Sequence, residues 1–259
     1  MTETLGIDRM RKVKSILVTQ ELPTDPTSPY FKIAEEYAVR VDFRPFIQVE
    51  PVELKEFRKQ KVEILNYTAV IITSRNALDH FFILCRELKI EMPPETKYFC
   101  ISEQTSNYLQ KYIVIRKRKI FTGLKDTQDL LEIIKKHKNE KFLFPCSDIR
   151  KNDIPDFFKE NSFHFCEAIT HHTVASNLSD LKEVYYDILA FFSPSGIHSL
   201  FTNFPDFKQS HTRIAAFGPA TAKAVREAGL VLDIEAPLPN APSMTGALEL
   251  YIKKANQSK

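Results

Sequence analysis

The chain alternates short apolar runs with helix-like stretches, and several apolar runs end in a turn of small, hydroxyl-bearing residues. The clearest turns are Phe-Phe-Ser-Pro-Ser-Gly at 191–196 and Phe-Gly-Pro-Ala-Thr at 217–221. Strands that alternate with helices predict parallel sheets with helices on both faces. A turn that opens a helix presents free backbone N–H groups and the positive end of the helix dipole, which attract anions. The pattern therefore predicts a doubly wound α/β fold with anion-binding turns.

A weaker copy of this arrangement lies in the first half of the chain. Ile-Ile-Thr-Ser at 71–74 and Ile-Ser-Glu-Gln-Thr at 101–105 stand in the same order as the two later turns. The helix-like run that starts at Thr127 likewise corresponds to the run that starts at Thr245. Three units repeated in the same order indicate two related α/β lobes, and a cleft for a polyanion is the natural interpretation.

The connectivity of the two lobes follows from the segments that the repeat does not contain. The first strand and helix, at 15–40, start a lobe that the repeat units at 69–138 do not complete. Extended stretches at 41–52 and 163–174 can form paired crossings. We therefore expect two doubly wound parallel lobes joined by a two-stranded linker, the middle lobe being inserted into the first. The expected boundaries are 1–47 with 173–259 for lobe 1 and 48–172 for lobe 2.

Apolar periodicity sets the expected elements. Strands are expected at 15–19, 41–46, 69–73, 97–101, 115–120, 141–144, 163–173, 187–192, 213–217 and 230–234. Helices are expected at 28–39, 53–65, 75–88, 103–112, 126–138, 152–161, 195–204, 219–228 and 243–254.

Composition excludes several classes of protein. No segment approaches the roughly 20 apolar residues of a membrane span, and the first residues lack the apolar core of a signal peptide. We therefore expect a cytoplasmic protein with no membrane partner.

The net charge of +3 is too small to indicate nucleic-acid binding. The basic run Arg-Lys-Arg-Lys at 116–119 is interpreted as a solvated strand or loop rather than a phosphate site. Four widely spaced cysteines in apolar surroundings are interpreted as reduced core residues: Cys85, Cys100, Cys146 and Cys166.

The ordered motifs resemble those of the uroporphyrinogen-III synthase family. The resemblance extends from about residue 14 to residue 253, and each motif alone is only moderately specific. Five motifs in the correct order carry it: Thr-Ser-Arg-Asn-Ala at 73–77, Leu-Phe-Pro-Cys-Ser-Asp-Ile-Arg at 143–150, Phe-Phe-Ser-Pro-Ser-Gly at 191–196, Phe-Gly-Pro-Ala-Thr-Ala at 217–222 and Gly-Leu at 229–230.

The resemblance implies a fold and an activity. It implies a two-lobed enzyme whose N-terminal segment packs with the C-terminal lobe. The family cyclises hydroxymethylbilane, a linear tetrapyrrole with eight carboxylates, with inversion of the last ring and loss of water. The resemblance thus implies a hydro-lyase of porphyrin and heme biosynthesis that positions its substrate in an interlobe cleft and needs no metal or organic cofactor. A monomer is expected, and the preceding pathway enzyme is a candidate partner.

Such a reaction depends on holding a bent polyanion in one geometry, and correct orientation alone can supply roughly 7–11 kcal/mol. We therefore expect turns that bind carboxylates. The alternative interpretation of each turn is a helix N-cap with no further role. Thr221 is taken as a catalytic candidate, and the substrate-binding candidates are Thr73, Ser74, Asn76, Thr105, Ser193, Ser195, Gly196 and Gly218. The Ser102-Glu103 turn departs from the family pattern.

His171 is the other departure from that pattern. The resemblance aligns residues 168–173 with a family stretch in which a tyrosine, the usual candidate for assisting departure of the hydroxyl, stands where this chain has His171. Because histidine can donate a proton near neutral pH, His171 is taken as the candidate acid. The alternative is a surface or interlobe histidine. A metal site that combines His171, His172 and His198 is disfavoured because nothing brings the third ligand near.

Two other functions stay open. The main rival is a non-catalytic, two-lobed sensor of tetrapyrroles or carboxylates, which the departures at His171 and Ser102 would suit. A receptor for a phosphorylated metabolite is a third interpretation. The chain has no Gly-x-Gly-x-x-Gly motif and no phosphate loop, which argues against a nucleotide ligand.

Overall fold

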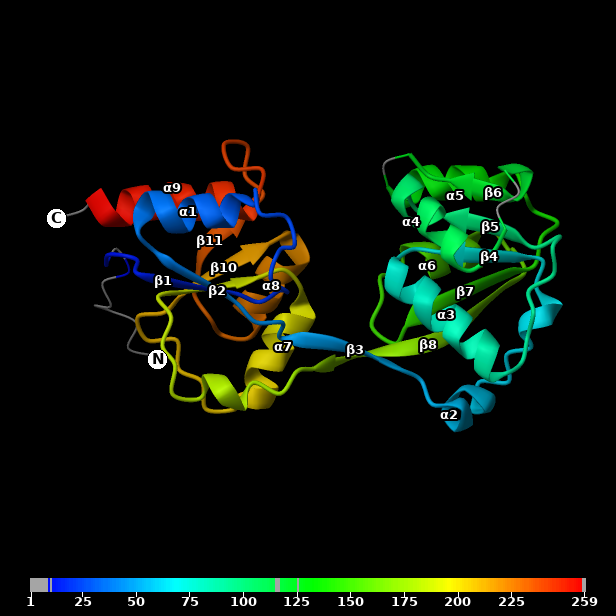
Figure 1. The fold of residues 1–259 in the computed structure, drawn as a ribbon, viewed down its shortest axis with the longest axis horizontal. Coiled ribbons are helices and arrows are strands. Elements are labelled where there is room, and N and C mark those ends of the chain that lie inside the picture. Colours follow the sequence, from blue (N-terminus) through cyan, green and yellow to red (C-terminus); the bar gives the residue numbers. More distant parts are fainter. Residues whose placement is uncertain (1–8, 10, 115–116, 125, 258–259) are drawn as a thin grey trace. The chain divides into compact units, whose positions relative to one another are not determined.

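The structure is a computed structural model that describes residues 9, 11–114, 117–124 and 126–257. The chain divides into two compact units. Unit 1 comprises Met1–Gln48 and Val174–Lys259, and unit 2 comprises Val49–Thr173. Both units are α/β, as the alternating pattern predicted (Figure 1). No helix in the described ranges is long and apolar enough to cross a membrane.

Unit 1 is built on a five-stranded sheet in the order β11-β10-β9-β1-β2. Strand β1 pairs in parallel with both β2 and β9, so the first strand of the chain joins the C-terminal strands, as expected from the repeat. The central strands β1, β9 and β10 are buried on both faces, which is typical of parallel sheets, whereas the edge strands β2 and β11 are partly exposed or half-buried. They are β1 (Ser15–Val18), β2 (Arg40–Phe43), β9 (Ile188–Phe191), β10 (Arg213–Phe217) and β11 (Leu232–Ala236).

Helices cover both faces of this sheet (Figure 1). Helices α1 (Pro29–Tyr37) and α9 (Met244–Gln257) lie side by side on one face, over Ile16 and Val18. Helices α7 (Pro194–Asn203) and α8 (Pro219–Glu227) lie on the other face, over Leu17. The alternation of Ile16, Leu17 and Val18 between two cores follows from the two-residue period of a strand.

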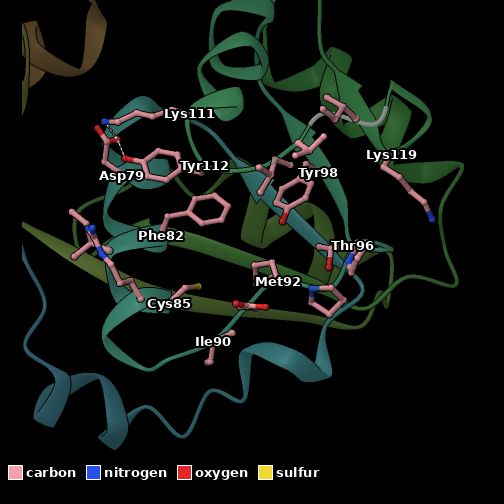
Figure 2. Close-up of a pocket in the computed structure, with 18 of the residues that line it drawn as sticks. Asp79, Phe82, Cys85, Ile90, Met92, Thr96, Tyr98, Lys111, Tyr112 and Lys119 are labelled. Atoms are coloured by element: carbon pink, nitrogen blue, oxygen red, sulfur yellow. Dashed lines mark hydrogen bonds and ion pairs between the residues drawn. The ribbon is translucent and has the colours of Figure 1, made fainter.

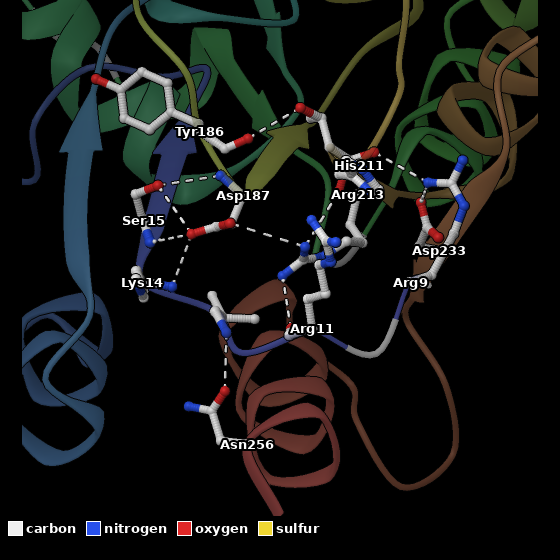
Figure 3. Close-up of polar contacts among 12 residues, drawn as sticks. Arg9, Arg11, Lys14, Ser15, Tyr186, Asp187, His211, Arg213, Asp233 and Asn256 are labelled. Carbon is white, nitrogen blue, oxygen red and sulfur yellow. Dashed lines mark hydrogen bonds and ion pairs between the residues drawn. The ribbon is translucent and has the colours of Figure 1, made fainter. Parts of the chain in front are cut away.

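The N-terminal segment is held against unit 1 by a polar cluster that Figure 3 shows. Arg213 is fully buried and donates to the backbone carbonyls of His211 and Arg11, at 3.2 and 3.1 Å. Its guanidinium lies 3.9 Å from the Asp187 carboxylate. Asp187 in turn accepts from the backbone amides of Lys14 and Ser15, at 2.8 and 3.0 Å. The cluster therefore joins the segment before β1 to β9 and β10.

Unit 2 is built on a six-stranded sheet in the order β3-β8-β7-β4-β5-β6. All four pairs of neighbouring strands from β8 to β6 are parallel: β8 with β7, β7 with β4, β4 with β5 and β5 with β6. The chain leaves unit 1 within β3 and returns to it within β8. The strands are β3 (Ile47–Pro51), β4 (Ala69–Ile72), β5 (Lys97–Cys100), β6 (Ile120–Thr122), β7 (Phe142–Ser147) and β8 (Phe165–Ala175).

Helices cover both faces of the unit 2 sheet (Figure 1). Helices α3 (Arg75–Glu87) and α4 (Glu103–Tyr108) belong to the face on which Val70 and Ile72 are buried. Helices α5 (Thr127–Lys135) and α6 (Asp153–Glu160) cover the opposite face. Short helical segments complete the unit: α2 (Leu54–Lys59), η1 (Ile64–Asn66), η2 (Leu109–Lys111) and η3 (Lys117–Lys119); unit 1 has η4 (Ser179–Leu181).

Several expected elements were wrong in extent: the strand expected at 41–46 ends at Phe43, and the helix expected at 126–138 ends at Lys135. The strand expected at 115–120 is η3 followed by β6, which starts only at Ile120; residues 115–116 lie outside the described ranges. The helix expected at 53–65 ends at Lys59, because Lys61 takes a left-handed conformation with φ 55°. Strand β7 continues past 144 through Pro145, which lies beyond the residues that pair with β4. Because proline has no backbone N–H, this position matters: here no backbone hydrogen bond to β4 is lost.

Candidate functional site

The topology of unit 2 marks one edge of its sheet as a ligand site. The chain runs from β4 to β5 and β6 on one side, and β7 and β8 lie on the other side of β4. Ligands of doubly wound sheets bind at such a switch point, beyond the carboxyl ends of the strands. Thr73 and Ser74 follow β4, and Ser147 ends β7 with Asp148 directly after it. These four residues therefore lie at the switch point of unit 2.

Unit 1 has an equivalent switch point between β1 and β9. Thr19 follows β1, and Ser193 follows β9. The Thr19 hydroxyl is buried and donates to the Ala190 carbonyl at 2.9 Å, so it is occupied in linking the two strands. Ser193 is the half-buried hydroxyl at this edge.

The serine before α7 and the serines before α3 and α4 share one geometry. Ser193, Ser74 and Ser102 are all extended, with φ between −158° and −151°. Each Oγ accepts from the backbone amide three residues later, at 3.2, 3.0 and 3.3 Å respectively. This is N-capping, which uses a lone pair of the hydroxyl. The hydroxyl hydrogen is not consumed by the cap and can still be donated to an anion.

Unit 1 brings its predicted residues to two neighbouring helix starts, because β9 pairs with β10 and α7 contacts α8. Ser195 is half-buried on the first turn of α7, and Gly196 is buried against the Phe191 ring. Gly218 has φ 86° and ψ 151°, a conformation that essentially only glycine adopts. Thr221 is 2% exposed on the first turn of α8.

Unit 2 places its predicted residues on α3 and α4 in a similar way, since β4 pairs with β5. Thr73 and Ser74 are half-buried, and Asn76 is exposed on the first turn of α3. Thr105 is buried, and its Oγ1 lies 3.1 Å from the Ser102 Oγ. The Thr105 hydroxyl is therefore part of the capping network of α4.

His171 lies in β8 opposite Ser147, close to the carboxyl edge of the sheet. It is 5% exposed, and its Nδ1 lies 3.0 Å from the Thr170 hydroxyl. The ring stacks on His80 of α3, with 5.1 Å between the ring centres. Burial, together with the neighbouring His80, lowers the pKa of His171 to about 4. At neutral pH its imidazole is therefore uncharged.

His172 has the opposite character. Its Nδ1 lies 3.0 Å from Asp148, and its Nε2 lies 3.0 Å from Glu56 of α2. The hydrogen bond to Asp148, with the charges of Asp148 and Glu56, raises the pKa of His172. Burial opposes ionisation of Asp148, but hydrogen bonds from the Thr173 amide and from His172 outweigh it, so the pKa of Asp148 is lowered. The three side chains form a charged link between α2, β8 and the end of β7.

The analysis of the sequence missed His80. The residue stands one helical turn after Asn76, on the same side of α3, which is the spacing that could have revealed it. Its Nδ1 is buried without a hydrogen-bond partner in the described part of the chain. Burial lowers the pKa of His80, so the two stacked imidazoles are both shifted toward the neutral form.

The described residues contain no group of three His, Cys, Asp or Glu side chains that could hold a metal ion. Among the histidines considered for such a site, His198 is exposed on α7 of unit 1, whereas His171 and His172 belong to unit 2. The cysteines are unpaired, and Cys166 is half-buried. Burial raises the pKa of the other three to about 12, which leaves them as unreactive thiols: Cys85, Cys100 and Cys146.

Comparisons with known proteins identify the family of the chain and relatives of its fold. The family model described as uroporphyrinogen-III synthase HemD matches residues 28–246. A uroporphyrinogen-III synthase from Saccharomyces cerevisiae is 25% identical, over 93% of this chain and 97% of its own. A uroporphyrinogen-III synthetase structure from Helicobacter pylori matches with a TM-score of 0.59 at 17% identity, covering 93% of this chain and 99% of that one. The structure of a mutant uroporphyrinogen III synthase from Thermus thermophilus matches with a TM-score of 0.55 at 14% identity, covering 95% of this chain and 100% of that one. The two structures show the same fold, and because the family model spans most of the sequence, the chain belongs to the uroporphyrinogen-III synthase family.

Proposed function

We propose that the protein is a uroporphyrinogen-III synthase, a lyase that cyclises hydroxymethylbilane with inversion of the last pyrrole ring and release of water. Membership of the family supports this activity. The observation that carries the proposal for this chain is the capped serine turn, which recurs with one geometry before α7 in unit 1 and before α3 and α4 in unit 2.

The substrate's eight carboxylates are the groups that these turns would bind. Each turn offers a serine hydroxyl hydrogen next to the positive end of a helix dipole. A hydrogen bond to a charged acceptor contributes about 1.5–3 kcal/mol. Several such bonds, from Ser193 and Ser195 in unit 1 and from Thr73, Ser74 and Asn76 in unit 2, would fix the conformation of a flexible chain. Gly196, Gly218 and Thr105 would act by shaping the turns.

The chemistry needs a hydroxyl to leave, so that an electrophilic azafulvene forms, and then attack by the final ring at its substituted carbon. The leaving hydroxyl must gain a proton to depart as water, and the new macrocycle must lose one. We propose that Thr221 and His171 supply hydrogen bonds to these groups. When the Thr170 hydroxyl donates to Nδ1 of His171, the proton of the neutral ring sits on Nε2 and can be donated there. A low pKa favours this role over donation from an imidazolium.

The finer parts of the proposal concern the setting of the reaction. We propose that the enzyme works as a cytoplasmic monomer and that the enzyme making hydroxymethylbilane is a transient partner. Light scattering of the purified protein, alone and mixed with that enzyme, measures both properties. A stable dimer would contradict the first, and unchanged mass and sedimentation in the mixture would contradict the second.

The test of the activity is the isomer ratio of the uroporphyrins formed from freshly made hydroxymethylbilane, with buffer as the control. The proposal expects mostly type III product. If folded protein gives only the type I product of spontaneous closure, the activity is refuted. Tight binding of hydroxymethylbilane without turnover would then favour the second candidate, a tetrapyrrole or carboxylate sensor. The observation that favours this candidate is the buried, neutral His171 in place of a tyrosine.

Substitutions of Ser193 separate binding from capping. Aspartate and asparagine cap helices as well as serine does, whereas alanine loses roughly 1 kcal/mol of stability. Ser193→Asp adds a negative charge where a carboxylate would bind, and Ser193→Asn is its neutral control of similar shape. The proposal expects a large rise of KM for Ser193→Asp, a small one for Ser193→Asn, and unfolding midpoints close to the wild type for both. Equal KM values for the two variants would show that Ser193 only caps α7.

A further inference from the structure

Unit 2 contains a cavity of about 1100 Å³ that the proposed reaction does not use (Figure 2). Its walls come from the later turns of α3, the loop at 90–94, the start of β5 and the segment at 111–114. Thr96 stands just before β5 and Ile120 begins β6, so the cavity reaches the amino edge of the parallel sheet. The capped turns stand at the carboxyl edge. The cavity is therefore a separate feature of the same unit.

Aromatic and aliphatic side chains form most of the wall. Phe82 of α3 stacks on Tyr112, with 4.7 Å between the ring centres and 4° between the planes. Tyr98 of β5 is buried in the lining, and Ile90 and Met92 of the loop between α3 and β5 add to the apolar wall (Figure 2). Cavities of this size with mostly apolar walls and a few polar groups are typical of small-molecule sites. Flat aromatic walls favour a flat ring, because rings pack well against rings.

The charged groups of the lining favour an anion. Three cations, Arg86, Lys111 and Lys119, face two carboxylates, Asp79 and Glu91. The carboxylate of Asp79 is engaged by Lys111 at 3.3 Å and by the phenols of Tyr108 and Tyr112. Lys119 pairs with Glu95 at 2.6 Å. Arg86 is exposed and has no carboxylate partner among the described residues, so it is the cation free to bind a ligand; the exposed Glu91 of the lining is likewise without an ion pair among those residues.

His80 adds a polar atom to the wall that lacks a partner. Its Nδ1 is buried and makes no hydrogen bond within the described part of the chain. Buried polar atoms in folded proteins are nearly always hydrogen-bonded, but solvent does not reach this atom, so the surrounding side chains would have to shift before a ligand could pair with it. The His80 ring itself stacks on the His171 ring.

We propose that this cavity is a second small-molecule site, which binds a flat aromatic ring system carrying a single negative charge. The ring packs against Phe82, Tyr98 and Met92, and the anionic group pairs with Arg86. The site shares no residue with the capped turns, although His80 in its wall stacks on His171, to which the proposed reaction gives a role.

The test uses 8-anilinonaphthalene-1-sulfonate, an aromatic monoanion that fluoresces in apolar surroundings, and N-phenyl-1-naphthylamine, its analogue without the sulfonate. Loss of one charge-assisted hydrogen bond in Arg86→Gln should raise the Kd of the sulfonate probe about tenfold. The Kd of the neutral probe should stay within about twofold of the wild-type value. Arg58→Gln, on the exposed surface of α2, is the matched control and should change neither. Equal affinity of the sulfonate probe for Arg86→Gln and the wild type would overturn the proposal.

A second pair of variants establishes where the probe binds. Unit 1 has a smaller apolar cavity of about 690 Å³, lined in part by Leu181, which is the competing location. Met92→Trp changes the wall against which the ring packs and should weaken binding, whereas Leu181→Trp should leave it intact. The reverse result would overturn the proposal. If Met92→Trp does not fold, as judged by circular dichroism, Ile90→Trp changes the same wall. The isomer-ratio assay, run separately, tells failure of this site from failure of the proposed activity.

Discussion

The low pKa of His171 makes the stability of unit 2 depend on pH in a predictable direction. Burial lowers this pKa from 6.5 to about 4. Between these values the unfolded chain takes up a proton that the native protein does not, so stability falls as the pH falls through this window and is fully present above pH 6.5. At about 1.4 kcal/mol per pH unit, the loss between pH 7 and pH 5 is about 2 kcal/mol. Replacing His171 by phenylalanine removes this loss.

The assay is denaturant unfolding at pH 7 and pH 5, followed by a probe in unit 2. For each protein, the free energy of unfolding at pH 5 is subtracted from that at pH 7. Comparing these differences between proteins removes the contribution of the other titrating groups, which all the proteins share. The loss for the wild type should exceed that for His171→Phe by about 2 kcal/mol. His198→Phe, an exposed histidine of α7, is the matched control and should lose as much as the wild type. A proton NMR titration of the His171 ring with a midpoint near pH 6.5 would refute the argument from burial.

Other perturbations test the geometry elsewhere. Gly218→Ala should cost about 1–3 kcal/mol from backbone strain alone, since an added Cβ meets no atom within 4 Å; an unchanged melting temperature would contradict this. Asp187→Asn removes a carboxylate 3.9 Å from the buried Arg213 and should lower the free energy of urea unfolding, by less than the roughly 3–5 kcal/mol of a fully broken buried pair because Asp233 also acts on Arg213; an unchanged free energy would show the pair to be dispensable. Asp148→Asn should lower the pKa of His172, measured by NMR, and a pKa that stays raised would assign the effect to Glu56 instead.

The sequence was informative about elements and much less about contacts between them. Apolar runs such as Ser15–Val18 are typical of strands buried on both faces, so the α/β class could be predicted, and the incomplete repeat predicted that the first strand joins the C-terminal lobe. The stack of His80 on His171 could not be predicted, because it joins α3 to β8 through the packing of the whole face. The acid role assigned to His171 used the ordinary pKa of histidine, which burial in the folded chain changes.

The capped serine turns explain why the same residues can be interpreted as structural or as functional. A serine at an N-cap uses its oxygen as an acceptor for the helix, and this alone accounts for its position before α7, α3 and α4. Anion binding uses the hydroxyl hydrogen, a different part of the same group, so neither role excludes the other. Truncation to alanine removes both roles at once and cannot separate them. A change of charge that keeps the cap, as in Ser193→Asp against Ser193→Asn, perturbs only the anion, and it is therefore the comparison on which the assignment of this site depends.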